Sequence, residues 1–299
     1  MIIKKINMID RILNKLGISL NEMQQEAFQS IAHGNKDVVV LSPTGSGKTL
    51  AYLLPLSQLV DAGDDEPQAI VVTPGRELAL QSSTVLKNMG SGLRAMACYG
   101  GRAAMDEHRV LKQVRPQIIF GTPGRLNDHL SKGNFSPYHI KYLVIDEFDK
   151  CLEMGFQDEM SRLIQSLPGL RRHFLLSATE AEEIPRFVHM GRVEKIDYRM
   201  DEEQVPERVH IYKVESPVKD KLESLGRLLR SLGETSTIVF LNYRDSVERT
   251  NNYLVEQGFS TSFFHGGLEQ KEREASLYRF SNGSANILVS TDLASRGLD

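Results

Sequence analysis

Two short segments of the 299-residue chain carry residue types that together handle a chain of phosphates and a divalent cation. The first, SPTGSGKT, follows an apolar run and precedes a stretch with helical periodicity. Glycines in such a loop let backbone N–H groups turn toward phosphate oxygens, while Lys48 supplies charge and the Thr49 hydroxyl offers a ligand to Mg²⁺. The helix start adds the positive end of its dipole. A glycine-rich turn before an ordinary helix is the alternative. We predict a triphosphate site formed by Ser42, Pro43, Thr44, Gly45, Ser46, Gly47, Lys48 and Thr49.

The second segment places three acids directly after an apolar strand: YLVID ends at Asp146, and Glu147 and Asp149 follow. Carboxylates gathered in this way repel one another and are costly to bury unpaired. Mg²⁺ and Lys48 supply the missing positive charge. We expect Asp146 to hold the metal, partly through water, together with Thr49, and Glu147 to orient and deprotonate an attacking water. Solvated acids at a strand end would be the interpretation without the loop upstream. The predicted catalytic residues are Lys48, Asp146 and Glu147.

Elements that can position these residues recur along the chain as short apolar runs separated by helical patterns. This alternation predicts an α/β fold with parallel sheets covered on both faces. The predicted strands are DVVVL (37–41), AIVVT (69–73), RAMACY (94–99), QIIF (117–120), YLVID (142–146), HFLLS (173–177), VHIYKV (209–214), TIVFLN (237–242), TSFFH (261–265) and NILVS (286–290). Polar residues follow the carboxyl ends of most of these strands, which is the edge where open parallel sheets bind ligands.

The charged segment YRMDEEQVPER (198–208) interrupts the pattern and predicts an interdomain linker. We therefore expect two related domains, residues 1–197 with the phosphate loop and residues 209–299, the second shorter and cut off. The composition is that of a globular protein, with 40% apolar and 25% charged residues, and the net charge of −3 confines any nucleic-acid site to a local patch. The basic amphipathic start predicts a surface helix. Two cysteines without metal-ligand spacing, Cys98 and Cys151, favour a reduced, cytoplasmic protein.

The full set of motifs resembles that of a DEAD-box ATP-dependent RNA helicase of superfamily 2. The resemblance covers essentially the whole chain, in SPTGSGKT, TPGRELALQ (73–81), GG (100–101), TPGR (122–125), DEFD (146–149), SAT (177–179), IVFLN (238–242), HGGLEQKER (265–273) and STDLASRGLD (290–299). It implies two RecA-like domains in tandem, the second incomplete, which clamp ATP between them and bind single-stranded RNA across their upper surface.

The resemblance assigns nucleotide contacts outside the phosphate loop. Gln24 in NEMQQEA resembles the glutamine that binds the adenine edge, and it gives the Q-x-x-A pattern with Ala27, although Gln25 is a rival. Gly297 and Asp299 resemble residues of the second domain that close over the nucleotide, Asp299 on the ribose. ATP and Mg²⁺ are the implied cofactors.

A link between the nucleotide and the RNA is implied as well. Asp149 resembles the last acid of the family motif, which hydrogen-bonds to the Ser-Ala-Thr segment through Ser177 and Thr179 and couples nucleotide state to RNA affinity. On its own, Ser-Ala-Thr would be interpreted as a strand end turning into a helix cap.

The implied RNA contacts consist of glycines that permit close approach, N–H groups at helix starts, and arginines that meet phosphates. None of them distinguishes bases, so sequence-independent binding is expected, with the 2′-hydroxyl separating RNA from DNA. A solvated helix face is the alternative for any single arginine. The residues are Pro74, Arg76, Gly100, Gly101, Thr122, Pro123, Gly124 and Arg125 in the first domain, and Arg244, Gly266, Arg273 and Thr291 in the second.

The sequence departs from the family pattern in several places. Phe148 stands where the family name has alanine, and Gly75 replaces the usual threonine, which removes a hydroxyl contact to RNA. Residues 1–27 contain no aromatic residue to stack on adenine, so selectivity depends on Gln24 and the backbone. The arginine motif that reaches the γ-phosphate belongs beyond Asp299. Such arginines contribute about 10³–10⁵ in rate, so we expect the chain as written to be a truncated, weakly active ATP hydrolase.

These features predict an ATP-dependent RNA helicase that remodels short duplexes by domain closure, as a monomer without a membrane anchor. An RNA clamp that binds ATP with little or no turnover is the alternative. There are two further alternatives: a DNA-directed helicase of the same superfamily, and a nucleotide-dependent switch with a protein partner. The physiological RNA is not specified by any of these residues.

Overall fold

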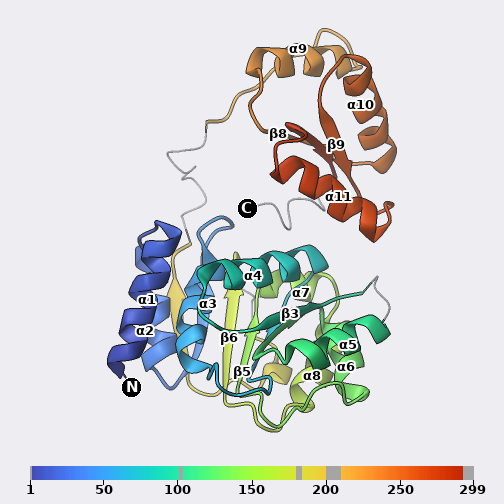
Figure 1. Cartoon of the computed structure of the whole chain (residues 1–299). Coiled ribbons are helices and arrows are strands. Elements are labelled where there is room, and N and C mark those ends of the chain that lie inside the picture. The colour runs from blue at the N-terminus through green and yellow to red at the C-terminus, as the bar shows by residue number, and fades with distance from the viewer. Residues whose placement is uncertain (1, 101–103, 180–183, 200–209, 292–299) are drawn as a thin grey trace. The chain divides into compact units, whose positions relative to one another are not determined.

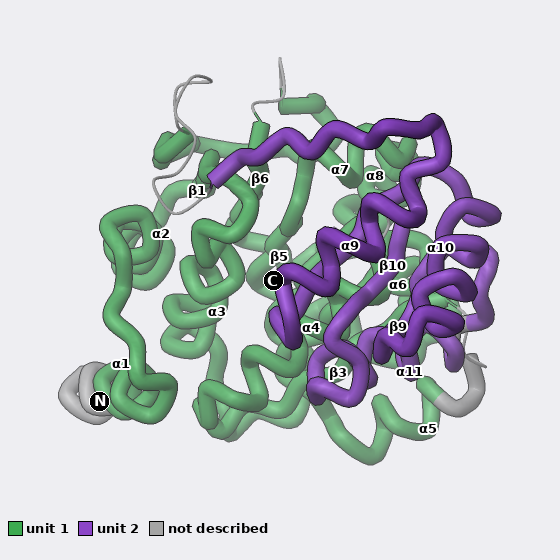
Figure 2. The backbone as a smooth tube through the Cα atoms, turned by 90° about the horizontal axis from the view of Figure 1, so that it is seen from above, with its two compact units in different colours: residues 1–204 green, residues 205–299 purple. Residues whose placement is uncertain are grey.

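The computed structural model describes residues 2–100, 104–179, 184–199 and 210–291, with side chains described outside residues 2–7, 104–106 and 270. The chain divides into two compact units, Met1–Gln204 and Val205–Asp299, drawn in green and purple in Figure 2. The division lies within the predicted linker 198–208, of which residues 200–208 lie outside the described part of the chain. Each unit, here called unit 1 and unit 2, is described by itself.

Unit 1 is built on a parallel sheet whose strands follow the order β3-β4-β2-β5-β6-β1-β7. Figure 1 labels β3, β5 and β6 of this sheet. All residues of β1, β2, β4 and β6 are buried, which explains why their sequences are nearly continuous apolar runs. The strands are β1 (Asp37–Leu41), β2 (Ala69–Val72), β3 (Ala95–Cys98), β4 (Ile118–Gly121), β5 (Tyr142–Ile145), β6 (Arg172–Ser177) and β7 (Val193–Asp197).

Helices cover both faces of this sheet, and alternate residues of its buried strands point into two separate cores. Val38 and Val40 of β1 contact the core formed with α1 to α4, whereas Val39 and Leu41 contact the core formed with α5 to α8. The helices are α1 (Ile2–Leu16), α2 (Glu22–His33), α3 (Lys48–Leu59), α4 (Arg76–Met89), α5 (Ala104–Val114), α6 (Pro123–Ser131), α7 (Phe148–Glu153) and α8 (Gln157–Gln165), followed by the short 3₁₀ helix η1 (Arg186–Val188). The predicted α/β class and the predicted N-terminal helix are confirmed.

Unit 2 contains a smaller parallel sheet in the order β8-β10-β9 within its described residues. Leu229 of α9 and Val247 of α10 pack against one face, and Leu277 and Phe280 of α11 pack against the other. The elements are β8 (Thr237–Phe240), β9 (Thr261–Phe264), β10 (Ile287–Ser290), α9 (Leu222–Leu232), α10 (Arg244–Glu256) and α11 (Gln270–Ser281). No described helix of either unit is both long enough and apolar enough to cross a membrane.

One strand prediction is wrong, and one strand of the structure was not predicted. Residues 210–214 of the predicted strand 209–214 are irregular, and their side chains are exposed, Ile211 at 77% and Tyr212 at 83%. Their alternating sequence suits a strand, but none of the described strands pairs with them. Conversely, β7 is a real strand that the sequence does not reveal. It pairs with β1 at the edge of the sheet and buries only Ile196, so its sequence VEKID has no apolar run.

The amino end of β1 is fixed by a buried acid. The Asp37 carboxylate accepts hydrogen bonds from the His173 backbone N–H at 2.7 Å and from the Gly191 N–H at 2.6 Å. Burial alone would raise the pKa of Asp37, but the hydrogen bonds from His173 and Gly191 outweigh it, so the pKa lies below its ordinary value. The ionised carboxylate therefore joins β1 to β6 and to the turn before β7.

This depressed pKa predicts how the stability of unit 1 depends on pH. The contribution of Asp37 is fully present above the ordinary aspartate pKa of about 3.9 and is lost as the pH falls through the lower folded-state pKa. We expect Asp37→Asn to lower the free energy of unfolding by about 1–3 kcal/mol at neutral pH, with the difference from wild type shrinking below pH about 4. Urea unfolding followed by circular dichroism measures this, with the exposed Asp158→Asn as control. A difference that grows in acid would contradict it.

Candidate functional site

The predicted phosphate loop connects the carboxyl end of β1 to α3, which begins at Lys48. Gly45 and Gly47 both adopt the left-handed backbone region, with φ of 78° and 83°. The positive φ disfavours any residue with a side chain at Gly47, and a Cβ atom there would lie 2.3 Å from the Gln24 side-chain nitrogen, which would have to shift. The loop therefore has the backbone conformation that the sequence predicts, with N–H groups at a helix start that can bind phosphate oxygens.

Lys48 is held by the loop itself. Its ammonium group donates hydrogen bonds to the carbonyl oxygens of Ser42 at 2.7 Å and Pro43 at 2.8 Å. Charged acceptors form stronger hydrogen bonds with an ammonium group than neutral carbonyls do. A phosphate group in the loop would therefore compete effectively for Lys48.

The amino end of α2 is bound to the phosphate loop. Asn21 and Gln24 form a reciprocal capping box, and the Gln24 side-chain N–H donates to the Gly47 carbonyl at 3.1 Å. Asn21 reaches the same loop through the Ser46 carbonyl at 3.0 Å. Gln25 instead is exposed and donates to Leu20. Between the two rival glutamines, only Gln24 contacts the phosphate loop, and it keeps one further side-chain N–H to offer a base.

The predicted acids follow β5. Asp146 is only 3% exposed, and its carboxylate accepts hydrogen bonds from the Tyr52 hydroxyl at 3.2 Å and from the Glu147 backbone N–H at 3.0 Å. Burial and the charge of Asp146 raise the pKa of Tyr52, so its hydroxyl stays neutral and acts as a donor. The Asp146 N–H in turn donates to Val72 at the end of β2, at 2.9 Å. Asp146 is thus fixed from a helix on one side and a neighbouring strand on the other.

Glu147 occupies a strained conformation. Its φ of 48° lies in the left-handed region, which residues with a side chain adopt at a cost. It is the residue immediately before α7, where the chain leaves β5 and turns into the helix. Such strain at the end of a buried strand is typical of residues whose side chain must be aimed at a ligand.

The predicted link between the acidic turn and the Ser-Ala-Thr segment is present as hydrogen bonds. The Thr179 hydroxyl donates to the Asp149 carboxylate at 2.9 Å, and the Thr179 N–H donates to the same oxygen at 3.2 Å. Ser177 makes a different contact from the predicted one, because its hydroxyl donates to the Thr179 carbonyl at 2.5 Å. Thr179 therefore makes the contact to the acid, and Ser177 stabilises the turn that presents it.

Phe148, the departure from the family name, is buried in the core between the sheet and α5 to α8. It lines a cavity of about 90 Å³ together with Ser177 and Thr179. The ring therefore packs beneath the turn, and the hydrogen bonds of the Asp146 and Asp149 carboxylates are formed in its presence.

Strand order separates the predicted nucleotide contacts from the predicted RNA contacts. The phosphate loop, the acidic turn and the Ser-Ala-Thr segment follow β1, β5 and β6, which are neighbours in the sheet. The described RNA residues of unit 1 follow β2, β3 and β4, which are also neighbours. The two groups meet where β2 pairs with β5. Both sets lie along the carboxyl edge of one sheet, as parallel topology requires.

The RNA residues of unit 1 differ in exposure. Gly100 and Gly124 are exposed, and Thr122 with Pro123 forms the start of α6. Arg125 is unlike them, because its side chain is only 13% exposed and its Nε–H donates to the Glu107 carboxylate at 2.8 Å. The described conformation therefore places Arg125 inside the protein. Pro74 and Arg76 flank the start of α4, and Gly101 lies outside the described residues.

The RNA residues of unit 2 also gather at one sheet edge. Arg244 opens α10 after β8, Gly266 follows β9, and Thr291 follows β10. The Arg273 guanidinium donates to the Leu268 carbonyl at 3.0 Å, which holds it near the loop after β9. The predicted nucleotide contacts Gly297 and Asp299 lie outside the described residues.

Comparison with known proteins decides the family. The family model described as DEAD/DEAH box helicase matches residues 21–187, and the model described as Helicase conserved C-terminal domain matches residues 220–299. This chain belongs to the DEAD-box helicases. It is 39% identical over 295 residues to the ATP-dependent RNA helicase DbpA of Escherichia coli (strain K12), covering 96% of this chain and 63% of that protein.

Further relatives agree. The ATP-dependent RNA helicase CshA of Limosilactobacillus reuteri is 35% identical over 281 residues, with 93% of this chain and 56% of that protein covered. The solved structure of S. cerevisiae Dbp5 bound to RNA and ADP BeF3 superposes with a TM-score of 0.84 at 25% identity, covering 98% of this chain and 75% of that one. The two-domain RecA-like fold is therefore confirmed. The chain spans between half and two thirds of the length of these two curated relatives.

Sequence reasoning missed three residues of this DEAD-box site. Asn21 could have been found, because Asn-x-x-Gln before an apolar run is a capping-box pattern. Tyr52 carries no such signal, since a tyrosine inside an apolar helix usually indicates core packing. Glu107 is hidden in a helix whose charged residues suggest a solvated face, although it is only 4% exposed.

The hydrogen bond between Tyr52 and Asp146 predicts a measurable loss of stability. Tyr52→Phe leaves a buried carboxylate with one donor fewer, and we expect the free energy of unfolding to fall by about 1–3 kcal/mol. Urea unfolding measured by circular dichroism tests this. The control Tyr138→Phe alters a side chain that is 73% exposed and should change stability by less than about 0.5 kcal/mol. Equal effects of the two variants would show that the buried bond contributes nothing.

Proposed function

We propose that this protein is an ATP-dependent RNA helicase that remodels short RNA duplexes, and that its two units close on ATP and RNA together. The observation that carries the proposal is the division of one sheet edge into a nucleotide side and an RNA side that meet at the β2–β5 pair. The relatives reported above, named as ATP-dependent RNA helicases, support the same conclusion.

Hydrolysis of ATP requires a held triphosphate and an activated water. The loop N–H groups and Lys48 bind the phosphates, because they present positive charge at the start of α3. Glu147 accepts the proton of the water that attacks the γ-phosphate, and the strained turn after β5 aims its carboxylate. Gln24 orients the base while its other contacts hold α2 against the loop.

A magnesium ion fits the donor set at this site. Asp146 offers a buried carboxylate and Thr49 a hydroxyl in the first turn of α3, and hard oxygen donors are the ligands that Mg²⁺ prefers. When bound, Mg²⁺ neutralises charge that develops on the phosphates during transfer.

Coupling between nucleotide and RNA requires a physical connection between the two sides of the edge. Asp149 and Thr179 join the segments after β5 and β6, and the Asp146 N–H joins β5 to the end of β2 just before Pro74. A change at the nucleotide therefore displaces backbone that carries RNA contacts. RNA is bound mainly through N–H groups and exposed glycines, which recognise the sugar-phosphate chain and not its base sequence.

Strand separation follows from differential affinity. ATP and single-stranded RNA each bind more tightly to the closed form, so each raises the affinity for the other. A closed form that bends one RNA strand excludes a straight duplex, and hydrolysis of ATP releases the bound strand.

We place the ATP-binding helicase domain at residues 1–197, the linker at 198–208 and the C-terminal helicase domain at 209–299. Two free, buried cysteines support a reducing, cytoplasmic compartment. We propose that the protein acts there as a monomer.

Coupled binding gives the main test. We expect a non-hydrolysable ATP analogue to raise the affinity for labelled oligouridine by at least about fivefold, as a coupling of about 1 kcal/mol or more requires. Glu147→Gln should keep this coupling and lower RNA-stimulated phosphate release by at least about 10². The measurements are fluorescence anisotropy and phosphate release. In a chain that includes the arginine motif expected beyond Asp299, coupled binding without RNA-stimulated turnover would instead favour the clamp, and equal stimulation by DNA would exclude RNA specificity.

The contact between Gln24 and the loop gives a second test with a built-in control. Gln24→Ala removes both the base contact and the bond to Gly47, so we expect ATP affinity to fall by at least about tenfold. Gln25→Ala removes the neighbouring exposed amide and should change ATP affinity by less than about twofold. Equilibrium binding of a fluorescent ATP analogue measures both. A larger loss for Gln25→Ala would transfer the adenine contact to that residue.

A further inference from the structure

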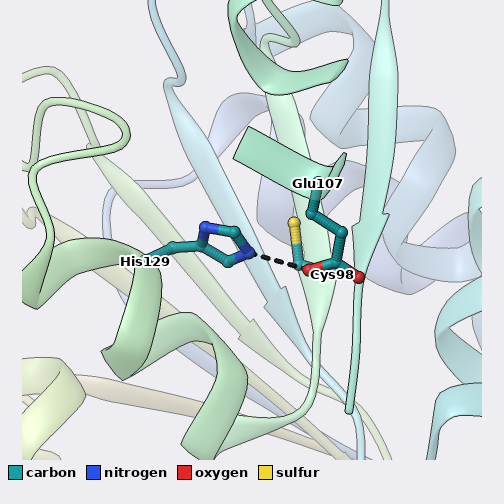
Figure 3. A group of neighbouring side chains, drawn as sticks. All are labelled: Cys98, Glu107 and His129. Atoms are coloured by element: carbon teal, nitrogen blue, oxygen red, sulfur yellow. Dashed lines mark hydrogen bonds and ion pairs between the residues drawn. The ribbon is translucent and has the colours of Figure 1, made fainter. Parts of the chain in front are cut away.

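A buried cluster of polar side chains lies beside the RNA half of the sheet edge and is used by none of the steps above. Cys98 at the end of β3, Glu107 of α5 and His129 of α6 each place one polar atom within 4.8 Å of the others. Figure 3 shows the three side chains close together, with a dashed line joining the His129 ring to the Glu107 carboxylate. All three are buried, with Glu107 4% exposed and His129 and Cys98 fully enclosed.

Glu107 is the centre of this cluster. One of its carboxylate oxygens accepts from Arg125 Nε and lies 2.8 Å from His129 Nε2, and the other accepts from the Tyr99 backbone N–H at 3.3 Å. Asn134 donates to His129 Nδ1, which places the imidazole proton on Nε2, facing Glu107. Burial acts to raise the pKa of Glu107, but these hydrogen bonds outweigh it, so the pKa lies below its ordinary value.

The segments that Glu107 joins are those predicted to contact RNA. Tyr99 directly precedes Gly100, and Arg125 ends the Thr122–Arg125 segment at the start of α6. The Thr122 N–H also donates to the Cys98 carbonyl at 3.3 Å, so the ends of β3 and β4 are bound to each other by backbone as well. The Glu107 side chain adds hydrogen bonds to both segments at once.

We propose that Glu107 is a positioning residue for RNA binding: its hydrogen bonds hold Arg125 and the end of β3 in place. Arg125 supports this arrangement through its bond to Glu107 and does not itself bind an RNA phosphate. The inference rests on the proposed RNA-binding function. Arg125 fits this role because its side chain is 13% exposed and its Nε–H is directed at a carboxylate, whereas Gly100 and Gly124 are exposed. The RNA phosphates then bind to backbone N–H groups of these two segments, whose positions the cluster fixes.

A metal centre is the competing explanation for a cysteine, a glutamate and a histidine so close together. The Arg125 guanidinium, 2.8 Å from the Glu107 oxygen, disfavours a cation there by charge repulsion. Burial raises the pKa of Cys98 far above that of an ordinary thiol, whereas metals bind the thiolate. The cluster is therefore better explained as a hydrogen-bonded support.

Amide exchange in the free protein tests the positioning without RNA. Glu107→Gln removes the charge that holds Arg125, and we expect exchange in residues 98–100 and 122–130 to accelerate by at least about tenfold, with the phosphate loop unaffected. Glu234→Gln makes the same charge change at an exposed residue of unit 2 and serves as control. Unaltered exchange in both segments would overturn the inference, whether or not the protein binds RNA.

RNA affinity tests the consequence. We expect Glu107→Gln to weaken binding of labelled oligouridine by about tenfold or more, while nucleotide affinity without RNA, which a general folding defect would lower, changes by less than about twofold. If exchange accelerates but RNA affinity stays at the wild-type value, the inference is overturned. If wild type itself does not bind RNA, the proposed function fails, and the exchange data still decide whether Glu107 holds the two segments. Should Glu107→Gln not fold, Glu107→Asp, which keeps the charge but shortens the reach, is measured in the same assays.

Salt dependence separates support from direct contact. Loss of one phosphate contact makes the plot of log affinity against log salt concentration less steep by about 0.7 for single-stranded RNA. We expect Arg125→Gln to weaken RNA binding without that change in slope, and a reduction of about 0.7 would assign Arg125 to a phosphate instead. Zinc content of the purified protein addresses the metal centre: stoichiometric zinc that is lost in His129→Gln would overturn the positioning role.

Discussion

Parallel alignment of the strands is the constraint on which the rest of the structure depends. Because β1 to β6 all run the same way, every loop that follows a strand emerges at one edge of the sheet. The strand order β3-β4-β2-β5-β6-β1 then sorts those loops into two groups. The groups meet at the β2–β5 pair, where neighbouring strands lie about 4.8 Å apart. At their boundary the two groups of loops are therefore one strand spacing apart, and the bond from the Asp146 N–H to the Val72 carbonyl bridges it.

The polar groups of this edge are held by partners from distant parts of the chain. Tyr52 of α3 donates to Asp146 after β5, Gln24 of α2 donates to the phosphate loop, and Thr179 after β6 donates to Asp149. Burying a polar group without a partner is costly, so each of these bonds restricts the loops to one arrangement. The same applies beside the predicted RNA contacts, where the Glu107 carboxylate accepts hydrogen bonds from two segments. Hydrogen bonds from surrounding residues that fix the positions of the site residues are what a preorganised site requires.

Motif residues do not all act at the surface. Arg125 belongs to a motif whose resemblance implies an RNA contact, yet its guanidinium lies inside the protein against Glu107. Phe148 lies in the acidic motif, yet it packs into the core beneath the turn. A motif therefore records which residue types a segment needs, whereas the packing of the segment decides which of them face a ligand and which hold the backbone in place.

Much of this protein was predictable from its sequence, for a physical reason. The central strands are buried on both faces and must be apolar, and the phosphate loop needs glycines where φ is positive, so both leave local patterns. The edge strand β7 leaves none, and residues 210–214 carry a strand pattern without a partner strand among the described residues. The contact of Gln24 with the phosphate loop, the role of Tyr52 and the pairing of Glu107 with Arg125 depend on residues far apart in the chain. Such contacts exist only once the strand order is set, so tertiary structure alone decided them.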